Sequence, residues 1–188
     1  MGALICDAAL QRRAKYKSTV RPRVQELIAA WPEADTVTTF AHRLSIDDVA
    51  QVLRWRRTAK IVVIREVTNA LQEAGVDTVD DLRRRLSDPE DSVALRARLR
   101  TIHGVGPKTV DYIGILAGVV NRAAIDVHVK AFIAQAGIEV SGYEEAHALI
   151  AEAARARGWE PAELDGAIWT QVSAAQPTRR IANTTVGP

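Results

Sequence analysis

Apolar side chains recur along most of this chain at intervals of three and four residues, which is the period of an α-helix. Ile64, Val67, Leu71 and Ala74 form one such stripe, with charged and polar side chains between them. The alternation typical of β-strands is almost absent. The pattern predicts an all-α fold with helices near residues 4–14, 20–30, 45–55, 59–74, 78–86, 89–101, 107–120, 127–136, 143–157 and 161–174.

Several of these helices have recognisable ends. Ser45–Asp48 and Thr78–Asp81 have the form of a capping box with aspartate at the third helical position. Asp88 precedes a proline, which is the favoured start of a helix. Gly75 and Gly137 stand where helix C-caps are expected. The polar segment 176–188 shows no period and is predicted to be a loose tail.

Composition narrows the class of protein. With 188 residues, 47% hydrophobic and 26% charged, the chain has the make-up of an ordinary globular protein. It lacks both an apolar run of about 18 residues and a signal peptide, so a cytoplasmic location without a membrane partner is expected. Cys6 is the only cysteine, which excludes an internal disulfide and sites held by several thiolates. We expect no resident cofactor and a monomeric protein.

Charge is distributed unevenly, although the net charge is only +2. Residues 1–60 hold eleven Lys or Arg and six Asp or Glu, whereas residues 139–165 hold two and seven. A basic half opposite an acidic half suits a protein that turns one side toward a polyanion.

The segment Leu99–Ile113 carries the most specific pattern. Two amphipathic helices are separated only by His103–Gly106 (His-Gly-Val-Gly), and Pro107 opens the second helix. A helix N-terminus with unpaired amides binds phosphate well, and glycines let a backbone come close. An ordinary αα-hairpin with a glycine turn is the structural alternative.

Lys108 and Asp126 are the candidate catalytic residues. Lys108 lies in the first turn of the second helix, where the helix dipole and partial burial both favour the neutral, nucleophilic amine. Asp126 lies eighteen residues later and is predicted to cap the next helix. A fixed carboxylate of this kind stabilises the positive charge that develops on a sugar when its glycosidic bond breaks.

These residues resemble the helix-hairpin-helix superfamily of DNA glycosylases that includes endonuclease III and 8-oxoguanine glycosylase. Gly104–Thr109 and Ile125–His128 match its hairpin and its catalytic loop, with Lys108 at the Schiff-base lysine and Asp126 at the aspartate. The resemblance implies a two-lobed helical fold with a cleft between the lobes. It also implies base flipping, attack of Lys108 on the sugar and strand cleavage by β-elimination.

The resemblance further implies a set of site residues and a domain division. One lobe would comprise residues 1–30 and 121–175, and the other residues 31–120 with the hairpin at 99–113. The implied contacts are to double-stranded DNA that carries a damaged base or an abasic site. They involve Gly104, Val105, Gly106, Thr109, His128, Lys130, Gln11, Arg12 and Arg13, and a monovalent cation on the main-chain carbonyls of Arg100, Ile102 and Val105.

The chain departs from the superfamily in three places. The four cysteines that usually hold an iron–sulfur cluster are absent, so no cluster is expected. The loop before Asp126 lacks the usual proline, and Gln11 stands only approximately where a gap-filling side chain is found.

Several alternatives stay open at this point. The protein is either the bifunctional glycosylase, a monofunctional glycosylase, a non-catalytic DNA-binding module or a protein-binding helical domain. Oxidised pyrimidines and 8-oxoguanine are both candidate lesions. The four tryptophans are expected in the core, with one of them or Tyr112 as a possible wall of a base pocket.

Overall fold

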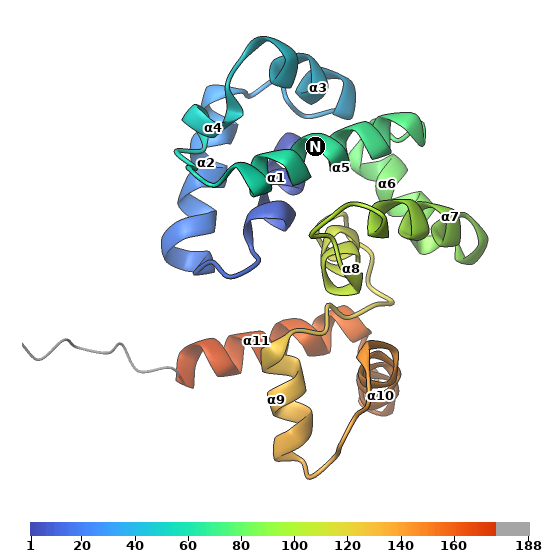
Figure 1. Cartoon of the computed structure of the whole chain (residues 1–188). Coiled ribbons are helices and arrows are strands. Elements are labelled where there is room, and N and C mark those ends of the chain that lie inside the picture. The colour runs from blue at the N-terminus through green and yellow to red at the C-terminus, as the bar shows by residue number, and fades with distance from the viewer. Residues whose placement is uncertain (176–188) are drawn as a thin grey trace, which may run out of the picture.

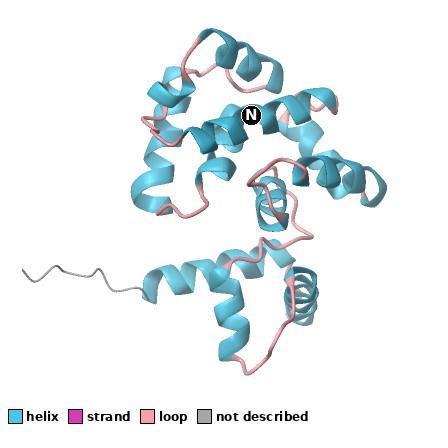
Figure 2. Cartoon of the chain, viewed as in Figure 1, coloured by secondary structure: helices cyan, strands magenta, loops and turns pink. Residues whose placement is uncertain are grey.

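The computed structural model describes residues 1–175, and every regular element in that range is a helix (Figure 2). The elements are α1 (Gly2–Leu10), the π-helical turn η1 (Tyr16–Val20), α2 (Arg21–Ala30), α3 (Val37–Ile46), α4 (Val49–Val52), α5 (Thr58–Glu73), α6 (Val79–Ser87), α7 (Pro89–Arg100), α8 (Pro107–Leu116), α9 (Val127–Gln135), α10 (Tyr143–Ala156) and α11 (Pro161–Ala175). The all-α prediction is therefore confirmed for these residues. The predicted tail, residues 176–188, lies outside them.

The buried apolar residues form two separate clusters. The larger cluster runs from Met1 to Val119 and the smaller one from Ala123 to Ile168. Figure 1 shows the same division, with α9, α10 and α11 grouped on one side of α8 and the earlier helices on the other.

The core assigns residues 1–30 differently from the sequence prediction, which had grouped them with residues 121–175. Ile5 and Leu10 are almost completely buried, and α1 packs against α2, α5 and α8 within the larger cluster. The apolar residues of α1 predict that this helix is buried. The cluster to which it belongs depends on the helices that it packs against, which are distant in the sequence.

Several predicted helix ends are confirmed. The hydroxyl of Thr78 accepts from the amide of Asp81 while the Asp81 carboxylate accepts from the amide of Thr78. Asp88 caps α7 by accepting from two amides of its first turn. Gly75 and Gly137 have φ of +68° and +75°, the left-handed conformation of a C-cap.

The predicted helix 45–55 is wrong in its start and its length, because only α4, Val49–Val52, lies within it, capped by Asp48. The chain forms α3 up to Ile46, and the Ser45 hydroxyl donates to the carbonyl of His42 instead of capping a new helix. A capping box between Thr36 and Thr39 starts α3, and Phe40 then buries its ring completely against α1. This box has no acidic residue, and the sequence analysis predicted no helix over residues 31–44, where most of α3 lies.

Two further helices end earlier than predicted. The first stops at Leu10, so that residues 11–15 form a loop in which Arg13 has φ of +58°. The second, α8, stops at Leu116 and is followed by Gly118 with φ of +90°. The shorter α1 matters for function because it moves a run of basic side chains from a helix face to a loop.

No helix in the described range is both long and apolar enough to cross a lipid bilayer.

Candidate functional site

A cleft of about 1410 Å³ opens between the two hydrophobic clusters. Its walls come from the loop after α1, the turn before α8, the first turn of α8, the start of α9 and one residue of α11. We call it the cleft; its lining residues are 8, 11–18, 104–106, 108–109, 125–128, 130 and 169. Six of these are Lys or Arg and one is acidic, so the cleft is suited to a polyanion.

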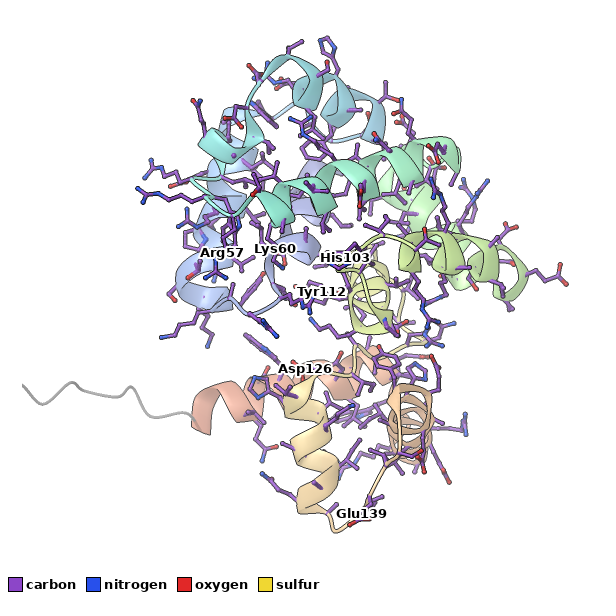
Figure 3. The ribbon with its side chains drawn as sticks, in the orientation of Figure 1. Arg57, Lys60, His103, Tyr112, Asp126 and Glu139 are labelled. Atoms are coloured by element: carbon purple, nitrogen blue, oxygen red, sulfur yellow. The ribbon has the colours of Figure 1, made fainter. Side chains whose placement is uncertain are left out.

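Lys108 reaches the cleft from the first turn of α8 (Figure 3 labels its neighbour Tyr112). Its Nζ donates to Oε1 of Gln11 over 2.5 Å and lies 4.5 Å from the centre of the Tyr112 ring. Burial lowers the pKa of Lys108 below its ordinary value, and the charge of Asp126 is the largest influence in the opposite direction. The amine is therefore easier to deprotonate than that of a surface lysine.

Asp126 faces the cleft from the start of α9 (Figure 3). As predicted, it caps this helix: Oδ1 accepts from the amides of His128 and Val129 at 2.8 and 3.0 Å. Within residues 1–175 its other oxygen, Oδ2, accepts no hydrogen bond. The carboxylate is thus held in direction while one oxygen stays available to a ligand.

The turn before α8 needs a residue with positive φ, and Gly104 provides it. Gly104 has φ of +92°, and an added Cβ would lie 3.8 Å from a guanidinium nitrogen of Arg12 and 3.5 Å from Val63. Gly106 is the N-cap of α8 in an extended conformation, with φ of −103°. A Cβ at Gly106 would meet nothing within 4 Å, so this part of the turn is open to an approaching molecule.

The backbone of this turn leaves donors unused. Pro107 has no amide hydrogen, and the amides of Gly106 and Lys108 donate to no other group in the described part of the chain. Such a helix start offers N–H groups to an anion. The carbonyl of Ile102, one of the three predicted for a cation, accepts from the amide of Val105 at 3.0 Å.

The structure brings the predicted site residues together. Both candidate catalytic residues line the cleft, and so do all nine predicted DNA contacts: Gln11, Arg12, Arg13, Gly104, Val105, Gly106, Thr109, His128 and Lys130. Arg100 and Ile102 do not line it. The cation on the carbonyls of Arg100, Ile102 and Val105 stays a prediction.

Asp7 is a neighbour of the site that the sequence analysis did not identify. This α1 residue is 7% exposed and accepts from the hydroxyls of Tyr112 and Tyr16 at 3.0 and 3.2 Å. Burial raises its pKa, and the charge of Lys108 acts against this rise. A lone carboxylate in the apolar helix GALICDAAL was the available signal.

A buried ion network holds the loop before Asp126. Asp111 of α8, 1% exposed, accepts from Arg96 at 2.5 Å, from Arg122 at 2.5 and 3.3 Å, and from the Tyr143 hydroxyl at 2.6 Å. Burial raises the pKa of Asp111, but these donors outweigh it and leave the pKa below its ordinary value. The network joins α7, α8, the loop and α10, and therefore links the two clusters.

Asp165 of α11 supports the same loop. Its Oδ2 accepts from the amide of Ala124 at 2.8 Å. Burial, together with the charge of Asp126, raises the pKa of Asp165 to about 6. Its carboxyl group therefore loses its proton near neutral pH, close to Asp126.

Replacing Asp165 with asparagine is expected to stabilise the protein at neutral pH. The folded chain binds this proton more tightly than the unfolded chain, whose aspartate pKa is about 3.9, so stability falls as pH rises from about 4 to 6 and stays lower above that. Asparagine keeps an acceptor for Ala124 without the charge. Urea unfolding at pH 7.5 should show Asp165→Asn more stable by about 1–3 kcal/mol, with the difference vanishing near pH 4. Equal stability of both proteins at every pH would contradict the buried charge.

Two aromatic side chains, Tyr16 and Trp169, are part of the cleft wall. Trp169 lies edge-on to Tyr16, with ring centres 6.0 Å apart, and the ammonium of Lys17 lies 5.6 Å from the Trp169 ring. Trp31 is buried in the core, as predicted, but the prediction of a core position is wrong for Trp159, which is 42% exposed. A flat apolar ring in a basic cleft provides a surface on which a base can stack.

Comparison with known proteins yields one match. A family described as a domain of unknown function (DUF8548) matches residues 5–173. No curated protein and no solved structure matches the chain.

Proposed function

The chain belongs to the DUF8548 family, and from its cleft we propose that it is a DNA glycosylase of base excision repair that also cleaves abasic sites. The observation that carries this proposal is the meeting of Lys108 and Asp126, each at the start of its own helix, on the wall of one basic cleft. Their separation along the chain and the adjacent glycine turn are those of the helix-hairpin-helix superfamily.

Lys108 acts as the nucleophile in this proposal. Its neutral amine attacks C1′ of the damaged nucleotide, the bond from C1′ to the base breaks, and the base leaves with a proton. The sugar ring then opens to an iminium between Nζ and C1′. Loss of a proton from C2′ expels the 3′ phosphate and cleaves the strand. The lowered pKa of Lys108 raises the fraction of amine that can begin this sequence.

Asp126 stabilises the charge that develops on the sugar. Two backbone amides fix its carboxylate, and the oxygen that accepts neither of them is available to the positive sugar ring. Lys108 donates to Gln11 rather than to Asp126, so the two groups are not joined to each other before substrate binds. A nucleotide that enters between them meets both.

The remaining parts of the proposal concern recognition. The turn at Gly104–Gly106 serves as a helix-hairpin-helix that holds backbone phosphates, and such contacts position DNA without reading its sequence. The damaged nucleotide leaves the duplex to reach Lys108, as in other enzymes that act on a base. The protein would work on chromosomal DNA as a cytoplasmic monomer of two lobes.

Borohydride trapping on abasic-site DNA tests the lyase step. Sodium borohydride reduces the iminium to a stable amine, so wild-type protein should form a covalent adduct and Lys108→Ala should form at least about 100-fold less. Lys130→Ala is the matched control, because Lys130 also lines the cleft but lies exposed on α9. It should still form the adduct.

Other results separate the alternatives. DNA binding without an adduct, and without release of any damaged base, would identify a non-catalytic DNA-binding module. Base release without an adduct would identify a monofunctional glycosylase. An adduct that persists in Lys108→Ala would show that another amine is the nucleophile.

A further inference from the structure

A second cavity of about 930 Å³ lies beside the cleft, and only residues 12–15 of its lining belong to the site described so far. We call it the basic groove; its lining residues are 12–15, 19, 23, 50–51, 54–57 and 60. Eight of these thirteen are Lys or Arg and none is Asp or Glu. So many cationic side chains repel one another, and water or an anionic ligand in the groove must offset this repulsion.

The wall of the groove is fixed rather than loose. Arg23 donates to the carbonyls of Leu53 and Arg54, both at 2.8 Å, and its guanidinium lies 5.5 Å from the centre of the Trp55 ring. This holds the turn after α4 against α2. In the described residues, Arg23 Nε and Trp55 Nε1 are buried without an acceptor.

Backbone strain also gathers here. Arg13 and Arg54, with φ of +58° and +46°, are the two non-glycine residues with positive φ between residues 1 and 175, and both line the groove. Such a conformation costs energy and is found more often where a side chain must be aimed. The two strained arginines belong to two different segments of the groove lining, the loop after α1 and the turn after α4.

Lys60 lies where the groove approaches the catalytic residues. Its Nζ donates to the carbonyl of Ala9 at 2.6 Å, and burial and the charges of Arg12, Lys108 and Arg57 lower its pKa to about 8. The residues shared by both cavities are 12–15, so the groove and the cleft are continuous.

We propose that the basic groove binds the phosphates of the DNA flank that leaves the cleft on one side of the damaged nucleotide. This proposal rests on the proposed function, because the path of the DNA is drawn from a damaged nucleotide bound at Lys108 and the glycine turn. Among the described residues, the only carboxylate paired with a groove residue is Glu26, 3.5 Å from Arg54. Arg23 and Lys60 donate to backbone carbonyls, and the other five groove cations have no carboxylate partner in the described chain and can meet phosphate oxygens.

The test compares duplexes that contain a stable abasic analogue and are shortened on one flank at a time. Wild-type affinity should fall when one particular flank is removed and change little when the other is removed. Arg56→Ala/Arg57→Ala should lose this asymmetry and reduce the slope of log Kd against log salt by about two, one for each phosphate contact. These two side chains are exposed and bear no core packing.

Arg83→Ala/Arg84→Ala is the matched control. It removes the same charge from α6, where both arginines are exposed, paired with Asp80 and Asp81, and outside both cavities. The affinity of this variant should depend on the two DNA flanks in the same way as that of the wild type. The proposal is overturned if the wild type shows no asymmetry or if the groove variant keeps it.

Borohydride trapping distinguishes this outcome from failure of the proposed function. If the protein forms no adduct but the flank asymmetry is present and lost in the groove variant, the groove proposal stands and the enzyme proposal fails. If the adduct forms and the groove variant binds like the wild type, the enzyme proposal stands and the groove proposal fails.

Discussion

Asp126→Asn is expected to lower the single-turnover rate of base release by about 100- to 1,000-fold. Asparagine caps a helix as well as aspartate, so the two amide contacts to His128 and Val129 persist and only the negative charge is lost. The rate is measured on duplexes that each carry one oxidised pyrimidine or one 8-oxoguanine, with the substrate that the wild type cleaves fastest. Trapping on abasic DNA should change far less, because the base is already absent.

Asp88→Asn is the control for this change. Asp88 caps α7 with the same pattern of two accepted amides and lies outside the cleft. It should leave base release unchanged, while both variants should unfold within about 1 kcal/mol of the wild type. If Asp126→Asn releases the base at the wild-type rate, the charge of Asp126 does not stabilise the transition state and the proposed electrostatic role is wrong.

Asp111→Asn is expected to destabilise the protein by about 3–5 kcal/mol, which corresponds to a fall in Tm of about 10 °C. The substitution removes the buried anion that Arg96 and Arg122 share, and leaves Arg122 only the exposed Glu144, at 3.5 Å, while Arg96 keeps no carboxylate partner among the described residues. The loop from Arg122 to Asp126 would lose its anchor as well, so base release should fall together with stability. Urea and thermal unfolding give the first readout and base release the second.

Glu73→Gln is the control for this second change. Glu73 also pairs with an arginine, Arg98, but their side chains are 62% and 51% exposed. Exposed pairs contribute little, so the loss should stay below about 1 kcal/mol. A loss in Asp111→Asn as small as that in Glu73→Gln would contradict the role of Asp111 as the link between the two clusters.

The local pattern predicted those features that depend on neighbours in the sequence. Thr78 and Asp81, Asp88 and Asp126 cap helices where they were expected to, because capping joins a side chain to amides two or three residues away. The same reasoning failed at Ser45, which lies inside α3, a helix whose Phe40 is completely buried. Local preference is weak when a large side chain is buried at long range.

The site shows the same limit. Lys108, Asp126 and the Gly104–Gly106 turn were predicted from type and spacing, and all of them line one cleft. Asp7 and Asp165 were not predicted, because the contacts that perturb them come from distant segments: Tyr112 lies 105 residues from Asp7, and Ala124 lies 41 residues from Asp165.

The sequence by itself determined the helical class and most helix ends, since each depends on periodicity or on contacts within one turn. The candidate reacting groups, Lys108 and Asp126, were predicted from their helix positions together with the resemblance to the helix-hairpin-helix glycosylases. Only the tertiary structure decided which core α1 joined, that Gln11 holds the amine of Lys108, and that the basic residues near 12 and 56 share one groove. These features depend on burial, charge repulsion and hydrogen bonds between segments that are distant in the sequence, so they cannot be predicted from a local pattern.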